Sequence, residues 1–274
     1  MLISFGFDIV YNCMQPTPML LSLNVHASRA ADLLTPDVLV TDPPAPRSAY
    51  HDIYGNWCTR LVAPAGPIKL STRGLLKDSG ALDPVHPYAH QHAVSDLPEE
   101  AITFLLGSRY CETDLLMETA WRLFGNAPLG WARVQAICDF VHNHIAFSYT
   151  DARATRTAFE AFKEKKGVCR DYAHLAVAFC RCMNIPARYC AGYLGDMGVP
   201  PPYGPMDFAG WFEAYLDGAW HTFDPRNNVP RLGRVLMARG RDATDVALTT
   251  SFGVNTLVSF KVYTDELISP TPAL

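Results

Sequence analysis

The spacing of the apolar residues changes along this chain, and that change restricts the possible folds more than any other feature of the sequence. From Ile3 to Tyr11 every second residue is apolar, a pattern typical of a β-strand with one buried face. Shorter runs of the same kind follow between Pro- and Gly-bearing turns, at 21–25, 57–61 and 68–72. We therefore predict an N-terminal β-sandwich-like domain over residues 1–80.

Residues 81–100 are polar and proline-bearing without sustained periodicity, so we predict a linker there. This segment contains His86, His90 and His92. Metal ligands could be arranged in this way, but solvated loop histidines are the interpretation we favour. We assign no metal site and no cofactor.

After residue 100 the apolar residues recur at helical spacings of three and four. Helices are predicted over 114–124, 131–145, 157–166 and 169–183. Strands are predicted over 187–194, 208–216, 220–224 and 254–262. The fold class is therefore α+β, with a second domain over 101–274 in which a helix beginning at Cys169 packs on an antiparallel sheet.

Charge and N-terminal sequence limit the partners. The net charge is −4 and Lys and Arg are scattered, so no basic run is present to neutralise a row of phosphates, and a nucleic-acid partner is excluded. Asp8 and Asn12 interrupt the apolar residues before a signal-peptide core or a membrane span could form. We predict a cytoplasmic protein without a membrane partner, and the oligomeric state stays open.

The eight cysteines are spread without CxxC pairs, which fits neither a zinc ribbon nor a disulfide scaffold. Cys169 differs from the others in its surroundings, because it follows Gly167 at the start of a predicted helix. The N–H groups of a helix N-terminus lower the pKa of a thiol and can hold the oxyanion of a tetrahedral intermediate. The alternative is an inert core cysteine at a helix start.

Several motifs occur in a fixed order between residues 167 and 225. They are GVCRDYAHL at 167–175, NIPARY at 184–189, GY at 192–193, WFEAY at 211–215 and WHTFDP at 220–225. In this order they resemble the transglutaminase-like superfamily, from the nucleophile helix to the two strands with the remaining catalytic residues. The N-terminal β region and SRYC at 108–111 are similar to the accessory part of bacterial members.

The resemblance implies a papain-like arrangement in which Cys is the nucleophile, His is the base and Asp orients the imidazole. Members of the superfamily include peptidases, transglutaminases, amidases and non-catalytic proteins. On this chain the motifs assign the nucleophile to Cys169 and the aspartate to Asp224. The histidine position, two residues before Trp211, holds Ala209, which cannot take a proton.

Other groups were weighed as replacements for the histidine. His174 lies five residues after Cys169, which rotates it by about 140° round the helix axis and away from the thiol. His221 is three residues from Asp224, an odd offset that places it on the opposite sheet face. Asp207 shares strand parity with Ala209, but its charge would raise the pKa of the cysteine.

Two further features surround these motifs. Residues 199–205 form a proline-rich stretch that we expect beside the mouth of the site. The arginines at 231, 234, 239 and 241 could recognise an anion, but salt bridges or packing over the sheet are the interpretation we favour.

Two functional hypotheses follow. In the first, the protein acts on amide bonds of proteins or peptides through a Cys169 thioester, as a peptidase or amidase or by acyl transfer to an amine. In the second, it is a transglutaminase-like binding or regulatory module that keeps the fold and the cysteine and has lost catalysis at Ala209.

Overall fold

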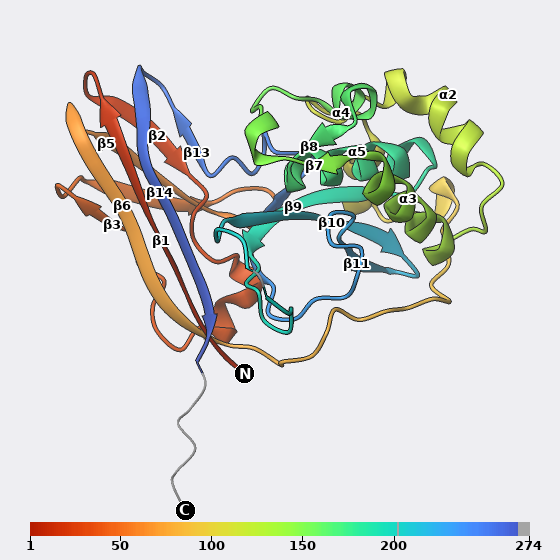
Figure 1. Ribbon diagram of the computed structural model, residues 1–274, viewed down its shortest axis with the longest axis horizontal. Coiled ribbons are helices and arrows are strands. Elements are labelled where there is room, and N and C mark those ends of the chain that lie inside the picture. Colours follow the sequence, from red (N-terminus) through yellow and green to blue (C-terminus); the bar gives the residue numbers. More distant parts are fainter. Residues whose placement is uncertain (202, 268–274) are drawn as a thin grey trace, which may run out of the picture.

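The computed structural model describes residues 1–201 and 203–267, and it has the α+β architecture that the sequence predicts (Figure 1). The N-terminal strands are β1 (Leu2–Cys13), β2 (Thr17–Leu21), β3 (Val40–Asp42), β4 (Arg47–His51), β5 (Trp57–Ala63) and β6 (Gly66–Lys77). The α-helices are α1 (Glu99–Ile102), α2 (Thr113–Phe124), α3 (Trp131–His144), α4 (Ala158–Glu164) and α5 (Cys169–Cys182). The later strands are β7 (Ala146–Phe147), β8 (Lys166–Gly167), β9 (Ala187–Tyr193), β10 (Phe208–Leu216), β11 (Ala219–Phe223), β12 (Val235–Gly240), β13 (Thr249–Ser251) and β14 (Asn255–Glu266).

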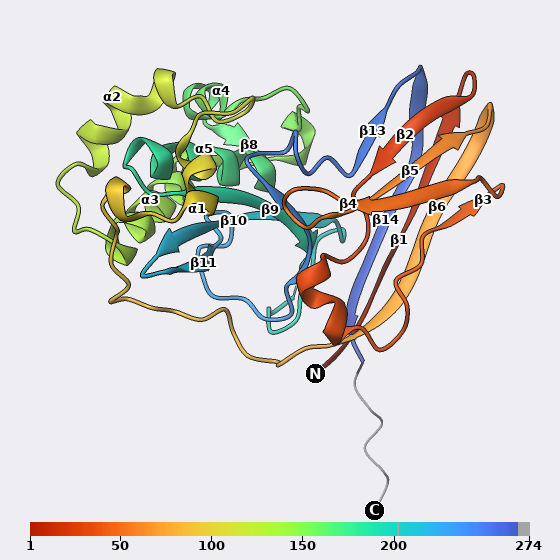
Figure 2. The same ribbon diagram turned by 180° about the vertical axis from the view of Figure 1, so that it is seen from behind.

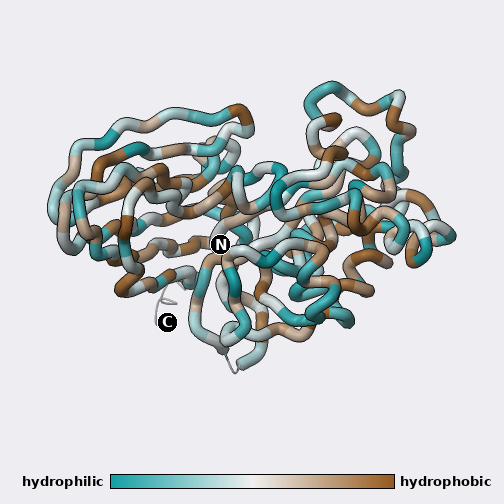
Figure 3. Tube along the Cα trace, turned by 90° about the horizontal axis from the view of Figure 1, so that it is seen from above, coloured by the Kyte–Doolittle hydropathy of each residue, from teal (hydrophilic) through white to brown (hydrophobic). Residues whose placement is uncertain are grey.

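Two four-stranded sheets form a sandwich, with the strand orders β14-β1-β6-β3 and β13-β2-β5-β4 (Figure 2). The alternation in β1 buries Ile3, Phe5 and Phe7 in a core to which both sheets contribute. Hydrophobic and hydrophilic segments alternate along these strands (Figure 3). The prediction of a strand over 3–11 and of a sandwich is therefore confirmed.

The last two strands return to the sandwich. β14 pairs antiparallel with β1 from Ile3 opposite Glu266 to Cys13 opposite Asn255, and β13 pairs with β2. The strand predicted over 254–262 is therefore part of the sandwich, and the domain bounds 1–80, 81–100 and 101–274 stay a prediction. An alternating pattern predicts a strand but not its partner, and here the partner lies far away in the sequence. This pairing also brings the two ends of the described chain together (Figure 1).

A third four-stranded antiparallel sheet, ordered β11-β10-β9-β12, supports the helices. Helices α2 to α5 gather over one of its faces (Figure 1), and α5 is buried from Asp171 to Cys182. Apolar side chains of α2, α3 and α5 form one core with β10 and the end of β11. The prediction that a helix beginning at Cys169 packs on an antiparallel sheet is confirmed.

Some local predictions differ from the structure. The strand predicted over 21–25 is wrong, since β2 covers Thr17–Leu21 instead. Leu23 and Val25 are buried, but they lie in a loop that leads to the 3-10 turn Ala27–Asp32. The segment predicted as a linker over 81–100 is held against the third sheet and α3, since Asp83 pairs with Arg234 beside β12 and the Ala89 carbonyl accepts from the Trp131 N–H at the start of α3. It includes the 3-10 turn Val94–Asp96 and the start of α1.

Within residues 1–201 and 203–267, no helix is long and apolar enough to cross a bilayer. The same part of the chain has no group of three or more His, Cys, Asp and Glu side chains placed to hold a metal. His86 and His90 are exposed, and His92 Nε2 accepts from the Gly218 N–H.

The sandwich and the sheet that carries the helices share a core at the start of β10. The Phe7 ring lies 6.1 Å from the Phe208 ring, and Phe7 has no exposed surface. We expect Phe7→Ala to lower the free energy of unfolding by about 3–5 kcal/mol, because it removes a buried aromatic ring and leaves a cavity. Urea unfolding followed by circular dichroism measures the loss, and Val62→Ala, at an exposed position of β5, should change stability by less than about 0.5 kcal/mol. A loss under about 1 kcal/mol for Phe7→Ala would contradict a shared core.

Candidate active site

Cys169 is the first residue of α5 and follows the short strand β8. Val168 is in an extended conformation, and its N–H donates to the Asp171 carboxylate at 2.9 Å. This contact satisfies an N–H group at the helix start that has no partner within the helix. The first turn of α5, and with it the thiol, is therefore held in place.

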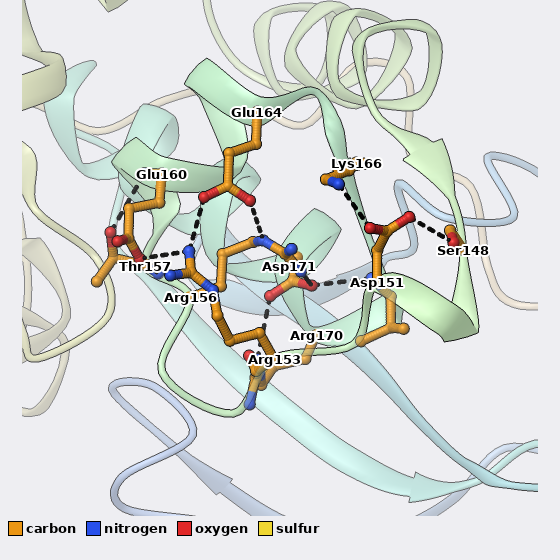
Figure 4. A network of polar contacts seen from close by, with 11 residues as sticks. Ser148, Asp151, Arg153, Arg156, Thr157, Glu160, Glu164, Lys166, Arg170 and Asp171 are labelled. Atoms are coloured by element: carbon orange, nitrogen blue, oxygen red, sulfur yellow. Dashed lines mark hydrogen bonds and ion pairs between the residues drawn. The ribbon is translucent and has the colours of Figure 1, made fainter.

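A buried ion pair fixes the carboxylate that caps this helix (Figure 4). Arg156 donates to Asp171 at 3.1 Å and to Glu164 at 3.0 Å, and the side chains of Arg156 and Asp171 are almost fully buried. Arg170 donates to the backbone carbonyls of Arg153 and Ala154. The loop before α4 is thereby tied to the start of α5.

Cys169 lines a cavity of about 130 Å³ at the beginning of β10. The cavity also contains four charged side chains, Asp196, Asp207, Arg226 and Arg231. Gly204 and Pro205 contribute to the wall, as expected for the proline-rich stretch 199–205, of which Pro202 lies outside the described residues. The thiol thus faces a small, highly charged space.

The surroundings of Cys169 favour the protonated thiol. Burial raises its pKa to about 11, and the charges of Asp207 and Asp224 act in the same direction. Hydrogen bonds from the backbone of Gly210 and Arg170 oppose this rise without cancelling it. Asp207 raises the pKa of Cys169, as predicted from the sequence. The lowering predicted from the helix N-terminus is smaller than the rise that burial causes.

No imidazole reaches this cavity in the described chain. Ala209 lines the cavity beside Cys169, opposite Gly192 of β9. His174 is buried, accepts from the Ala243 N–H and stacks on Tyr110, and burial lowers its pKa to about 3.

His221 also lies elsewhere. Its Nε2 is 3.1 Å from the Leu216 carbonyl oxygen, and its ring contacts Trp131 of α3, on the helix-covered face of the sheet. Neither His174 nor His221 therefore lies where it could replace the base histidine. The rotation of His174 round the helix and the position of His221 on the opposite sheet face account for this.

Asp224, directly after β11, is buried, and both of its oxygens have partners. Oδ1 accepts from the Asn227 N–H, and Oδ2 accepts from the Asn227 amide at 2.7 Å and from Arg234 at 2.8 Å. Burial raises the pKa of Asp224, but the Arg234 guanidinium and the Asn227 hydrogen bonds outweigh it and leave the pKa below its ordinary value. Both oxygens of the Asp224 carboxylate are thus bound within the protein, and neither is left free to accept from an imidazole.

Asp224 and Arg234 do not line the Cys169 cavity, whereas Asn227, which donates to Asp224, does. The role of Arg234 as the partner of Asp224 was not evident from the sequence. Arg234 also donates to Asp83 from its Nε, and its guanidinium lies 5.0 Å from the centre of the Trp211 ring. The arginines from 231 to 241 had been assigned to salt bridges or packing, and Arg234 and Arg241 do form ion pairs. The sequence contained no signal that Asp224 would be the partner of Arg234.

Comparisons with known proteins agree with this architecture. The model of the transglutaminase-like superfamily matches residues 120–225. A crystal structure from Cytophaga hutchinsonii, described as a "putative cysteine protease", is 30% identical with a TM-score of 0.85 and covers 99% of this chain and 92% of that chain. An uncharacterized protein of Mycobacterium leprae is 37% identical over 95 residues, and the chain spans only 33% of the length of that relative.

The Arg156–Asp171 pair offers a test of how the start of α5 is held. We expect Arg156→Met to lower the free energy of unfolding by about 3–5 kcal/mol, because it removes the buried cation of the Asp171 carboxylate, which then keeps only the more exposed Arg170 at 3.2 Å. Urea unfolding measures the loss. Arg153→Met is the matched control: Arg153 belongs to the same network, but its side chain is 41% exposed, so its loss should cost less than about 1 kcal/mol. Equal losses in the two variants would argue against the buried pair as the anchor.

Proposed function

The chain belongs to the transglutaminase-like superfamily, and from this premise we propose that it is a non-catalytic member that binds protein or peptide segments at the Cys169 cavity. The observation that carries the proposal is Ala209, which lines the cavity where the resemblance places the base histidine. No histidine among the residues described lines this cavity in its stead.

The electrostatics of the site support the same conclusion. A thiol with a pKa of about 11 is almost entirely protonated at neutral pH, whereas the nucleophile of a cysteine enzyme is the thiolate. The carboxylate that would orient an imidazole is occupied by Arg234 and Asn227. Among the residues that the structure describes, the cavity thus has neither a histidine base nor a free carboxylate at Asp224 to orient one.

The charged cavity suits a polypeptide segment. Arg226 offers donors for peptide carbonyls, and Asp196 and Asp207 offer acceptors for N–H groups, whereas Arg231 already donates to Asn227 and to the Gly195 carbonyl. The relative from Cytophaga hutchinsonii is described as a "putative cysteine protease", which supports a polypeptide as the ligand. A cytoplasmic location stays a prediction from the N-terminal sequence.

A second candidate function is amide-bond chemistry with Asp207 as the base. It is favoured by one observation, namely that Asp207 lines the same cavity as Cys169 and burial raises the pKa of its carboxyl. In that reaction the thiol proton passes to the Asp207 carboxylate while sulfur attacks the amide carbon. Asp207 then passes this proton to the amide nitrogen, and the C–N bond breaks to release the amine and form the thioester. Water opens the thioester to a carboxylic acid, or another amine opens it to a new amide, and either reaction restores the Cys169 thiol.

The pH dependence of alkylation tests the state of the thiol. Because the thiolate is the reacting form and the pKa of Cys169 is about 11, we expect its alkylation rate by iodoacetamide to rise about tenfold per pH unit from pH 7 to 10 without a plateau. Peptide mass spectrometry assigns the modified residue, and Cys169→Ser serves as the blank. A plateau below pH 8 would mean an activated nucleophile and would overturn the proposal.

Asp207→Asn separates the two candidate functions when alkylation and peptide cleavage are both measured. It should speed alkylation at pH 8, since loss of the negative charge lowers the pKa of Cys169. Asp196→Asn is the matched control, at another carboxylate of the cavity. If wild-type protein cleaves a peptide amide and Asp207→Asn abolishes that cleavage, the second candidate function is correct.

Placing a histidine at position 209 tests whether the alanine there is what prevents catalysis. We expect Ala209→His to raise hydrolysis of 4-nitrophenyl acetate by about 100-fold, the lower range of what a positioned general base contributes. The gain should vanish in the Cys169→Ala, Ala209→His double variant and should not appear with Ala209→Gln. An unchanged rate in a folded Ala209→His protein would show that more than the histidine is missing.

A further inference from the structure

A second cavity, of about 650 Å³, opens at the side of the sandwich where the edge strands β3 and β4 lie. Its walls come from the 3-10 turn Ala27–Asp32, from the segment 33–39 before β3, and from β4 and β5. None of its lining residues lines the Cys169 cavity, so the two cavities are separate. Its volume falls within the range of about 300–1,000 Å³ that is typical of small-molecule sites.

The edge strand β4 has an inner face that the protein itself does not cover. Arg47, Ala49 and His51 alternate along the strand, so they share one face, and all three line the cavity. Every residue of β4 is exposed, whereas the inner face of a sandwich strand is normally buried against the opposite sheet. The space that a facing layer would fill is thus open to a ligand.

The part of the cavity around Ala49 is apolar. Val25 and Leu39 line it as buried residues, and Val38 and Trp57 line it while 48% and 40% exposed. An apolar chain placed here removes its own surface and these side chains from water, and each methylene buried in this way strengthens binding about fourfold. This part of the cavity therefore favours a ligand with a hydrocarbon body.

The cavity also has polar lining residues, and several of them already have partners within the protein. The Asn24 amide donates to the Asp37 carbonyl, and the Asp37 carboxylate accepts from the Val25 N–H and the Thr72 hydroxyl. The Ser48 hydroxyl accepts from an arginine of β5 at 3.3 Å. These groups are satisfied without a ligand.

Arg47 differs from them, because its guanidinium forms no ion pair and no hydrogen bond with another described residue. It directly follows the turn 43–46 after β3, whereas Asp37 precedes β3, so this cation and this anion belong to different ends of that strand. Burial raises the pKa of Asp37, which disfavours its charged form. His51 packs against the Trp57 ring, with the ring centres 5.1 Å apart, and adds no negative charge. A guanidinium in this position matches a carboxylate, whose two oxygens can accept from it together.

We propose that this cavity binds a free long-chain fatty acid, whose carboxylate pairs with Arg47. The hydrocarbon chain of the ligand covers Ala49 and Val38 and fills the space between β4 and the segment before β3. This site is independent of the chemistry proposed for Cys169.

Isothermal titration calorimetry on the full chain tests the proposal with three probes kept below their micelle concentrations. We expect dodecanoate to bind once per chain. Decanoate, which is two methylenes shorter, should bind about tenfold more weakly, because less hydrocarbon is buried. Dodecyltrimethylammonium has the same tail with a cationic head, and it should also bind about tenfold more weakly than dodecanoate, because it cannot pair with Arg47.

A charge substitution identifies the group that holds the carboxylate. Arg47→Gln should weaken dodecanoate binding about tenfold and remove the preference for dodecanoate over dodecyltrimethylammonium. Arg60→Gln is the matched control, at an exposed arginine of β5 that does not line the cavity, and it should leave both affinities unchanged.

Two tryptophan substitutions locate the hydrocarbon chain. Ala49→Trp fills the cavity and should abolish binding, whereas Val62→Trp, at an exposed position of β5 outside the cavity, should leave it unchanged. Thermal unfolding shows which variants are folded, and Arg47→Gln, at an exposed edge position, keeps the test valid if Ala49→Trp does not fold. Absence of dodecanoate binding, equal affinity for the two dodecyl probes, or undiminished binding by folded Arg47→Gln would each overturn the proposal.

Discussion

The contact on which the site depends most is the buried pair between Arg234 and Asp224. Arg234 also pairs with Asp83, so one guanidinium connects β12, the end of β11 and the segment that leaves the sandwich. Removing either carboxylate would leave a charge buried with incomplete compensation, and such changes are costly. In a Cys-His-Asp site the carboxylate serves the imidazole. Here the Asp224 carboxylate instead binds Arg234 and Asn227 and so stabilises the fold, which agrees with an alanine at position 209.

The sandwich takes part in shaping the site. Its core includes Tyr193 and Phe208, which lie at the ends of β9 and β10 beside the Cys169 cavity. The Phe5 ring lies 5.2 Å from the Tyr193 ring, so β1 supports these strand ends directly. Because β14 completes the sheet that contains β1, the last strand of the described chain helps to position residues around the thiol.

The sequence predicted the elements whose information is local. The alternation from Ile3 and the start of α5 at Cys169 were predicted correctly, since burial of one face and a glycine before a helix are read from neighbouring residues. The partner of β14 and the pairing of Arg234 with Asp224 were not, because both depend on contacts between residues distant in sequence. The strand β12 was missed because Val235 to Ala238 are all apolar and buried, so this short run has no two-residue alternation.

The pKa of Cys169 shows how local and tertiary effects compete. A helix N-terminus stabilises a negative charge by about 0.3–1 kcal/mol, and by up to about 2 kcal/mol in partly buried geometry. A rise from the ordinary value of 9.0 to about 11 corresponds to about 3 kcal/mol in the opposite direction, with burial as the largest contribution and the carboxylates of Asp207 and Asp224 adding to it. The local argument for a reactive cysteine was sound in its direction, but the tertiary contributions exceed it. A positively charged imidazolium at position 209 would lower the pKa of Cys169 and so oppose the effects of burial and of the two carboxylates. With an alanine there, the thiol stays protonated.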